Sequence, residues 1–339
     1  VCSFIGQRKC TFGPMQRRTQ RHQKITVETA RLKSDQTGYD RASTILADGG
    51  LVAFPTETVY GLGADARNDV AVARIFEAKG RPRFNPLIVH VASVAQAKTY
   101  VAWSEEADRL AAAFWPGPLT LVLPIKPNCG LSPLVTADLP SLAIRMPAHP
   151  VARALLSTFG GPVAAPSANP SGKISPTTAA HVAQGLDGRI EAIVDGGSCD
   201  VGVESTIVGL LGEPMLLRPG GLPNEIIEAA LGGAVPHHQD ADPLIAPGQM
   251  TSHYAPSAQI RLNATDLHSG EILLGFGNVD ATLNLSAAGD LVEAASNLFQ
   301  MLHLMDKMDT KSIAISPIPD HGLGRAINDR LRRAAAPRP

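Results

Sequence analysis

The chain has 339 residues, of which 44% are hydrophobic and 18% are charged. This composition excludes disorder over most of the chain, and the length favours two domains. Lys and Arg total 30 against 31 Asp and Glu, so the net charge of -1 gives no overall attraction for DNA or RNA. No apolar run approaches the ~20 residues that a membrane span needs.

The first 24 residues form a basic leader with six Lys or Arg and no acidic residue. They lack the apolar stretch of a secretory signal. We expect residues 1–24 to be disordered, or to be translated ahead of the true start, and a transit peptide is the alternative. The four cysteines form no Cys-x-x-Cys pair, which disfavours a zinc site and fits a reducing, cytoplasmic environment.

Residues 25–232 alternate short apolar runs with helical periodicity, which predicts one α/β domain. We expect strands at 51–54, 87–91, 119–123, 142–145, 163–165, 192–194, 205–208 and 215–218, and helices at 39–47, 70–78, 107–114, 150–159, 177–186 and 224–231. Strands outnumber helices and several follow one another directly. The pattern therefore predicts a twisted, mixed sheet with helices.

Residues 233–257 are rich in Pro and Gly and predict a linker. Residues 258–336 then predict a second, smaller domain, with strands at 272–276 and 312–315 and helices at 290–308 and 324–334. This β-α-β-α order is typical of a Rossmann-like unit. It lacks a Gly-x-Gly-x-x-Gly turn, so we predict no dinucleotide there.

Polar residues follow several predicted strands, where α/β sheets bind ligands. The first such segment, 55–63, offers hydroxyls at Thr56, Thr58 and Tyr60, and its two glycines permit close backbone approach. A hydroxyl-rich turn without a ligand explains this segment equally well.

The second segment, 79–86, lies at the end of a predicted helix and before a predicted strand. It carries Lys79, Arg81 and Arg83. Three cations in five positions suit a triphosphate, which Arg grips as a fork and Lys contacts as a point charge. A solvated basic loop is the commoner explanation of such runs. His90 follows within a strand and gains a functional role only through these neighbours.

The third segment, 164–175, combines small residues, hydroxyls and an amide on the way to a helix start. Such a loop suits a phosphate or a ribose, although a capped loop explains it as well. In the fourth place, Ser205 opens a strand, while Arg145 and Arg218 end strands. A buried Arg needs a partner, and a ligand anion or a structural carboxylate would each serve.

We find no nucleophile elbow and no clustered metal ligands in the sequence. The candidate residues are donors and cations, which bind and position a substrate. That inventory suits nucleotidyl transfer, in which alignment and charge neutralisation supply most of the catalysis.

Short motifs follow one another along almost the whole chain. They are Pro-Thr-Glu-Thr-Val-Tyr-Gly-Leu-Gly (55–63), Lys-Gly-Arg-Pro (79–82), Asn-Pro-Leu (85–87), His90, Trp-Pro-Gly-Pro-Leu-Thr (115–120), Arg-Met-Pro (145–147), Pro-Ser-Ala-Asn-Pro-Ser-Gly (166–172), Glu-Ser-Thr (204–206), Arg-Pro-Gly (218–220), His-Tyr-Ala-Pro (253–256) and Gly-Leu-Gly-Arg-Ala-Ile-Asn-Asp-Arg-Leu (322–331). In this order they resemble the YrdC-type threonylcarbamoyl-AMP synthases, in their long two-domain form.

The resemblance implies an enzyme that joins L-threonine, bicarbonate or CO2, and ATP, and releases pyrophosphate. Its product would pass to a complex that modifies position 37 of tRNA. The implied threonine-binding residues are Thr58, His90, Arg145, Ala165 and Ser205, with Arg145 on the carboxylate. The implied ATP-binding residues are Lys79, Arg81, Asn85, Ser141, Ser167, Asn169, Ser175, Arg218 and Tyr254.

In this family pattern Lys79 and Arg81 also position the reacting groups, and no covalent intermediate is needed. Tyr254 would close over the nucleotide as part of a lid, and Mg2+ would be held through the phosphates rather than by protein ligands. The alternatives are a related carbamoyl-transfer or adenylating enzyme with another substrate, or a non-catalytic RNA-binding module.

Overall fold

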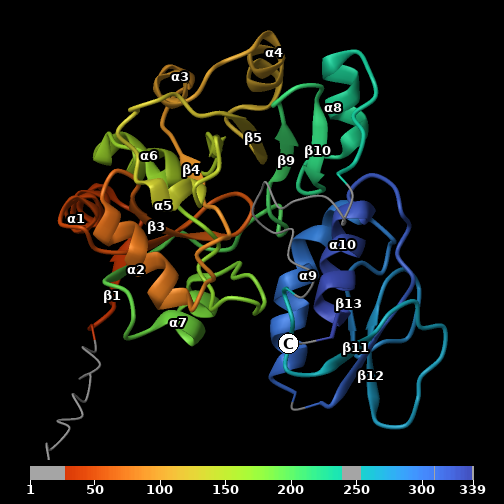
Figure 1. Ribbon diagram of the computed structural model, residues 1–339. Helices are drawn as coiled ribbons and strands as arrows, with labels where there is room; N and C mark the ends of the chain where they lie inside the picture. Colours follow the sequence, from red (N-terminus) through yellow and green to blue (C-terminus); the bar gives the residue numbers. More distant parts are fainter. Residues whose placement is uncertain (1–26, 239–252, 309, 338–339) are drawn as a thin grey trace, which may run out of the picture.

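The computed structural model describes residues 27–238, 253–308 and 310–337. The predicted leader at 1–24 and most of the predicted linker therefore lie outside the described residues. The described chain forms two sheets, one for each of the predicted α/β regions (Figure 1). The exact domain limits of 25–232, 233–257 and 258–336 stay a prediction.

Within the described residues, ten strands form the large sheet, in the order β1-β8-β2-β3-β7-β4-β6-β5-β9-β10. Their bounds are β1 (Ala30–Lys33), β2 (Val52–Pro55), β3 (Tyr60–Asp65), β4 (Ile88–His90), β5 (Leu119–Pro124), β6 (Ser141–Arg145), β7 (Val163–Ala164), β8 (Ala192–Asp195), β9 (Thr206–Gly209) and β10 (Met215–Arg218). The sheet contains both parallel and antiparallel pairs, for example β4 parallel to β6 and β6 antiparallel to β5. The predicted mixed sheet is confirmed.

Helices pack around this sheet and bury their apolar faces against it. They are α1 (Gln36–Ala47), α2 (Asp69–Lys79), α3 (Val94–Tyr100), α4 (Glu105–Phe114), α5 (Pro133–Thr136), α6 (Pro150–Phe159), α7 (Ala179–Leu186) and α8 (Asn224–Leu231). Most begin at a polar cap, as α2 does at Asn68, whose side chain accepts from Val70 N and Ala71 N. Gly80 ends α2 in the left-handed conformation.

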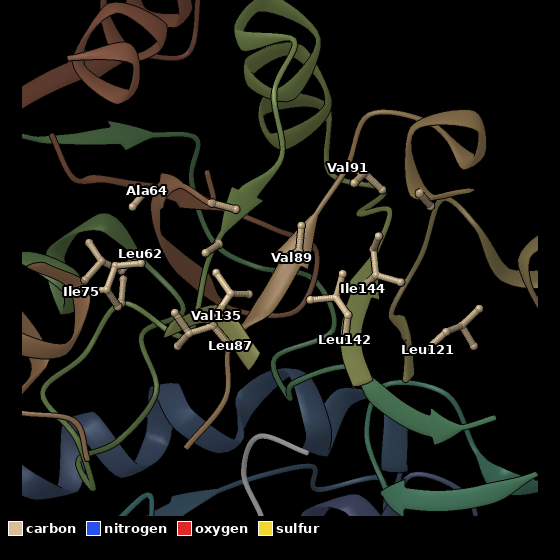
Figure 2. Packing of buried hydrophobic residues seen from close by; sticks show 14 of the residues in the cluster. Leu62, Ala64, Ile75, Leu87, Val89, Val91, Leu121, Val135, Leu142 and Ile144 are labelled. Carbon is tan, nitrogen blue, oxygen red and sulfur yellow. The ribbon is translucent and has the colours of Figure 1, made fainter. Parts of the chain in front are cut away.

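The main core consists almost entirely of aliphatic side chains, as expected for a chain with 4% aromatic residues. Leu62, Leu87, Val89 and Ile144 are fully buried, and Figure 2 shows Leu62 beside Ile75 of α2 and Leu87 beside Val135 of α5. Burying such a side chain contributes roughly 1.5–3 kcal/mol to the free energy of folding. This core holds rigid the strands that carry the candidate site residues.

The segment 60–65 is a central strand, β3, and not the continuation of a loop as the sequence analysis assumed. Its glycines weaken the strand signal. They are required because a Cβ on Gly63 would lie 2.8 Å from Phe54 Cε1, and a Cβ on Gly61 would lie 3.3 Å from Ala165 Cβ. The close approach that we predicted for these glycines is therefore made to neighbouring strands.

The second sheet is small and wholly parallel, in the order β11-β14-β12-β13. Its elements are β11 (Gln259–Arg261), β12 (Glu271–Gly275), β13 (Leu283–Asn284), β14 (Ser312–Ile315), α9 (Leu291–Asp306) and α10 (Gly324–Ala335). The Rossmann-like prediction is confirmed, although β11 and β13 were not predicted because both are short. No helix among the described residues is long and apolar enough to cross a membrane.

One apolar cluster joins the two parts of the structure. It contains most of the small sheet's core, such as Phe299 and Ile315, and also Val59 and Val203 from loops beside the large sheet. Tyr254, just after the undescribed part of the linker, is buried in the same cluster. The small sheet's helices therefore pack directly against the loops that follow the large sheet's strands (Figure 1).

Candidate active site

A cavity of about 50 Å³ lies where the loops of the large sheet meet the residues after the linker. It is lined by Thr56, Thr58, Val59, Gly61, Arg81, Ile88, His90, Arg145, Ala165, Pro166, Ser167, Glu204, Ser205, Arg218, His253 and Tyr254. All five residues predicted for threonine are among them. So are four of the nine predicted for ATP, namely Arg81, Ser167, Arg218 and Tyr254.

The cavity lies against a face of the sheet and not at one edge. His90 on β4 pairs with Arg145 on β6, and Arg145 pairs in turn with Thr120 on β5, so these three side chains share one face. The strands β2 and β7 run opposite to β4 and β6. The carboxyl ends of β2 and β7 therefore point the opposite way from those of β4 and β6. The expectation that ligands bind beyond the carboxyl ends of strands does not by itself bring these residues together.

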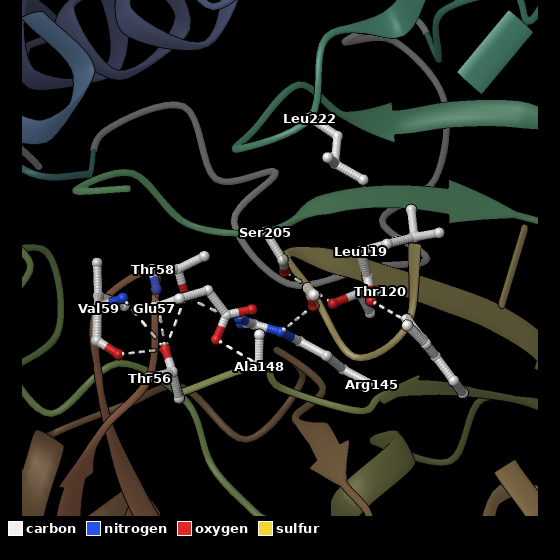
Figure 3. Close-up of polar contacts among 12 residues, drawn as sticks. Thr56, Glu57, Thr58, Val59, Leu119, Thr120, Arg145, Ala148, Ser205 and Leu222 are labelled. Atoms are coloured by element: carbon white, nitrogen blue, oxygen red, sulfur yellow. Dashed lines mark hydrogen bonds and ion pairs between the residues drawn. The ribbon is translucent and has the colours of Figure 1, made fainter. Parts of the chain in front are cut away.

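Arg145 lines the cavity and contacts three protein groups. Its Nη2 lies 2.7 Å from Glu57 Oε1, its Nη1 donates to Thr58 Oγ1 at 2.9 Å, and its Nε donates to Gly117 O at 3.2 Å. Figure 3 shows the guanidinium reaching toward Glu57 and Thr58. The sequence left open whether Arg145 pairs with a ligand anion or with a structural carboxylate. The structure shows a structural carboxylate, that of Glu57.

Glu57 was not singled out in the sequence, although an acid between two threonines in a buried segment was a signal. Its side chain is almost fully buried, and it also accepts from Ala148 N at 3.1 Å. Burial acts to raise the pKa of Glu57, but the charge and hydrogen bond of Arg145 hold that pKa below its ordinary value. The pair is thus ionised, and it fixes both the Arg145 fork and the Thr58 hydroxyl.

The hydroxyls of the first segment are oriented by one another. Thr56 Oγ1 donates to Val59 O at 2.6 Å and lies 2.8 Å from Thr58 Oγ1. Thr56 therefore holds the turn that presents Thr58 to the cavity. Both hydroxyls are buried, and Thr58 lines the cavity.

A second hydroxyl pair borders the cavity from β5 and β9. Thr120 Oγ1 lies 2.7 Å from Ser205 Oγ, and Arg218 Nη2 donates to Ser205 O at 2.9 Å and to Ser205 Oγ at 3.2 Å. Thr120 was missed because its motif offered only one hydroxyl within an apolar strand. Ser205 is thereby fixed between a threonine and a guanidinium.

Two buried cations beside the cavity lack a carboxylate partner within the described residues. Lys79 Nζ donates to Ser167 O and Asn169 O, both at 2.5 Å, and Arg81 donates to Asn85 Oδ1 at 2.6 Å and to Pro86 O at 2.9 Å. Burial, and next the charge of Arg81, lowers the pKa of Lys79 well below its ordinary value. Burial also lowers the pKa of Arg81 to about 10.

Uncompensated buried cations are costly unless a ligand anion completes the site. Arg83, the third cation of the same segment, is exposed and does not line the cavity. The alternative of a solvated basic loop therefore describes Arg83 and not its two neighbours.

Five of the residues predicted for ATP do not line the cavity, and three of them support residues that do. Lys79 holds the backbone of Ser167, Asn85 holds Arg81, and Ser175 Oγ donates to Glu204 Oε1. Asn169 donates to Lys173 O at 2.8 Å and so closes its own loop. Ser141 is buried at the opposite end of β6 from Arg145.

The loop 164–175 does not run directly into a helix. The helix predicted from 177 begins at Ala179, with Thr178 as the cap that accepts from His181 N. Ser175 and Pro176 precede it as extended chain, and Tyr60 N donates to Pro176 O at 2.8 Å. The helix start expected to follow this loop directly thus lies two residues later, and the backbone before it is bound to β3.

His90 is neutral in this site. Burial, and next the charge of Arg145, lowers the pKa of His90 to about 3. Its Nδ1 lies 3.3 Å from Ile88 O. A neutral imidazole can hydrogen-bond a substrate without adding to the positive charge beside Arg145.

His253 and Tyr254, near the end of the predicted linker, cover the cavity. Tyr254 is 1% exposed, has a φ of 64° and stacks edge-on against His253, with their ring centroids 4.0 Å apart. Burial and the surrounding cations, Arg81 first, lower the pKa of His253 well below its ordinary value. His253 and Glu204 were quoted in motifs but not assigned to the site.

The described residues contain no group of three or more His, Cys, Asp or Glu side chains that could hold a metal ion. The arrangement is a set of oriented hydroxyls at one end and buried cations at the other. Such donors and cations suit an amino acid and a polyanion.

Two family models match the chain in succession. The model for the Sua5, YciO and YrdC proteins, described as telomere recombination, matches residues 44–220. The model described as the C-terminal domain of threonylcarbamoyl-AMP synthase matches residues 222–336.

Individual relatives match over most of the chain. A threonylcarbamoyl-AMP synthase of Bacillus subtilis is 42% identical over 337 residues, covering 91% of this chain and 96% of the relative. A much shorter protein of the same name from Halorhodospira halophila is 42% identical over 160 residues, covering 46% of this chain and 81% of the relative. The crystal structure of P. abyssi Sua5 complexed with L-threonine has a TM-score of 0.84 and 41% identity, covering 91% of this chain and 98% of that one.

The first family model covers more than half of the chain, and a relative at 42% identity covers nine tenths of it. The chain therefore belongs to the threonylcarbamoyl-AMP synthase family.

Proposed function

We propose that this chain makes L-threonylcarbamoyl-AMP from L-threonine, bicarbonate or CO2, and ATP. The observation that carries the proposal is the convergence of the hydroxyl and cation segments on one cavity. Thr58, Ser205 and neutral His90 form a polar end that suits a small hydroxylated amino acid. Arg81 and Arg218 line the cationic end, with Lys79 buried beside it, and together these cations suit a triphosphate.

The roles of the two ends follow from their chemistry. Arg145 offers the threonine carboxylate a guanidinium whose position Glu57 already fixes. Ala165 contributes backbone, and Ser167, with Asn85, Asn169 and Ser175 supporting the loops beside it, completes the nucleotide side. A role of Ser141 in binding ATP rests on the family resemblance alone. Mg2+ would be held by the phosphates rather than by a protein cage.

The reaction needs no covalent enzyme intermediate. The threonine amine adds to CO2 and loses a proton to form a carbamate. A carbamate oxygen then bonds to the α-phosphorus while the bond to pyrophosphate breaks. Lys79 and Arg81 neutralise charge on the departing pyrophosphate, and the buried cavity keeps water from the unstable carbamate.

The product would be the substrate of a separate threonylcarbamoyl transferase complex acting on position 37 of tRNA, in the cytoplasm. A P. abyssi relative was crystallised with L-threonine, which supports the amino-acid assignment. A related enzyme with another substrate, or a non-catalytic RNA-binding module, remains the alternative that the test must exclude.

The test is pyrophosphate release from ATP, Mg2+ and bicarbonate with each amino acid in turn. Threonine should give the strongest signal, and removal of bicarbonate should abolish it. Release that does not depend on threonine would overturn the substrate, and salt-dependent RNA binding without any turnover would favour the RNA-binding module.

A further inference from the structure

The C-terminal helix α10 sends one arginine into the wall of the cavity. Arg330 is fully buried, and it belongs to the motif at 322–331 that the catalytic assignments leave unused. Its Nε donates to Glu204 Oε2 at 2.7 Å, across a sequence separation of 126 residues. Glu204 lines the cavity directly.

Further contacts fix the guanidinium in place. Arg330 Nη1 donates to Asp329 Oδ2 at 2.6 Å and to Pro219 O at 2.9 Å, next to Arg218 of the site. Its Cζ lies 5.3 Å from the ring centroid of Tyr254, within cation–π range. The Arg330 side chain therefore contacts Tyr254 and Glu204 at the same time.

Glu204 depends on this arginine for its charge. Burial acts to raise the pKa of Glu204, while Arg330 first and then Arg218 and Ser175 hold it below its ordinary value. As an ionised carboxylate, Glu204 accepts from Ser175 Oγ and precedes Ser205 in the chain. A buried carboxylate that lost its cation would take up a proton instead.

We propose that Arg330 is a positioning residue that fixes the Glu204 carboxylate, and through it Ser175 and Ser205, in the catalytic cavity. The inference rests on the proposed function, because Ser175 and Ser205 are assigned there to ATP and threonine. The small domain thus completes the active site of this chain.

The same helix offers a matched control. Arg325 also forms an ion pair with the large-sheet region, through Arg325 Nη1 and Glu225 Oε1 at 2.8 Å, but both side chains are at least one third exposed. Exposed pairs contribute little, whereas breaking a buried pair leaves an uncompensated charge. Arg325→Met therefore removes an interdomain arginine without touching the cavity.

The experiment compares Arg330→Met, Arg330→Lys, Arg325→Met, Glu204→Gln and the Arg330→Met/Glu204→Gln double variant. Threonine-dependent pyrophosphate release is measured between pH 5.5 and 8.5. We expect Arg330→Met to lower kcat/KM by about 30-fold or more, Arg325→Met to change it less than about 2-fold, and Arg330→Lys to recover part of the loss.

The pH profile separates positioning from mere packing. Without Arg330, the pKa of Glu204 rises, so the activity of Arg330→Met should fall as pH falls through a new acid limb. That limb should vanish in the double variant. Adding Arg330→Met to Glu204→Gln should cost less than about 3-fold, since both act through one contact.

An unchanged pH profile in Arg330→Met, or fully additive losses in the double variant, would overturn the proposal. If Arg330→Met alone fails to fold, the double variant decides. Recovery of folding when Glu204 is also neutralised supports the coupling, and continued misfolding assigns Arg330 to packing alone.

Failure of the proposed function is recognised separately. If the unmodified chain shows no threonine-dependent release, the coupling is read from thermal unfolding. A buried Glu204 with a raised folded-state pKa favours folding below its unfolded pKa and loses that contribution as pH rises. The Tm of Arg330→Met should therefore gain on acidification relative to the unmodified chain, and the double variant should not. Equal pH dependence of all three would overturn the inference.

Discussion

At the scale of single residues, the buried arginines and lysines of the site differ in the partner that each one has. Arg145 and Arg330 are each held by a buried carboxylate, Glu57 and Glu204. Lys79 is held only by carbonyl oxygens within the described residues. A cation with a carboxylate partner serves as a fixed donor, whereas burial without one disfavours the charged form of Lys79, which a ligand anion would stabilise.

Lys79→Met tests this distinction. We expect kcat/KM for ATP to fall by about 100-fold, which corresponds to roughly 2.8 kcal/mol, because a charge-assisted phosphate contact is lost. The Tm should stay within a few degrees, since removal of an uncompensated buried charge offsets the lost hydrogen bonds. The exposed Lys173→Met, in the same loop region, is the control and should change kcat/KM less than about 3-fold.

Thr58→Val tests the threonine end. The substitution keeps the shape of the side chain but removes the hydroxyl that accepts from Arg145. We expect the KM for threonine to rise about 10-fold or more while the KM for ATP stays within about 2-fold. Thr58→Ser should restore most of the affinity. An equal rise in both KM values would show that Thr58 supports the whole cavity instead.

At the scale of elements, the sequence predicted well where an element has one face to bury. Helix α6 was predicted at 150–159 and lies there, with Pro150 at its first turn and Gly160 after its end. Helix α8 and strand β10 also have their predicted bounds. Residues close in the sequence mark the ends of these elements, and a single sequence shows those residues.

Two of the strands that were missed, β1 and β3, depend on distant neighbours. Strand β1 exists because it pairs with β8, more than 150 residues later. Strand β3 contains two glycines whose need arises only from Phe54, Val163 and Ala165. The same limit applied to the site, since the motifs supplied Thr58, His90 and Ser205, but the partners Glu57, Thr120 and Arg330 follow from packing.

Gly63→Ala tests the packing argument for β3. A Cβ there would lie 2.8 Å from Phe54 Cε1 and 2.9 Å from Val163 Cγ1, so we expect a loss of about 1–3 kcal/mol in the free energy of unfolding. Denaturant titration measures it. Gly212→Ala, where a Cβ would meet nothing within 4 Å, should stay within about 0.5 kcal/mol. Equal stability of the two variants would contradict the argument.

At the scale of the whole molecule, several histidines are folded in the neutral form. Burial, and next a nearby cation or His303, lowers the pKa of His90 and His181 to about 3, and burial lowers that of His303 to about 4. His181 on α7 and His303 on α9 stack across the contact between the two sheets' helices, with centroids 3.8 Å apart. His253 is neutral for the same reason, beside four cations.

Acidification should therefore weaken the whole fold. The unfolded chain binds protons on these histidines below pH about 6.5, and the folded chain does not, so stability present above that pH is lost as pH falls toward 4. Each full proton steepens the loss by about 1.4 kcal/mol per pH unit. We expect more than two protons in total, after discounting the partly exposed His181.

Denaturant titrations at pH 7, 6 and 5 measure the slope. His303→Phe keeps a ring to stack on His181 and should reduce the slope by up to one proton. A free energy of unfolding that does not change between pH 6.5 and 5 would contradict this expectation.

The order of strands in the large sheet also sets a schedule for biosynthesis. Strand β2 can pair with β3 at once, but its other edge waits for β8, and the contact between Leu51 and Glu191 spans 140 residues. At a translation rate of about 5–20 residues per second, that edge stays open for roughly 7–28 s. An unpaired apolar edge can recruit strands from other chains. The interval between the synthesis of β2 and that of β8 is thus a period in which nascent chains need protection from aggregation.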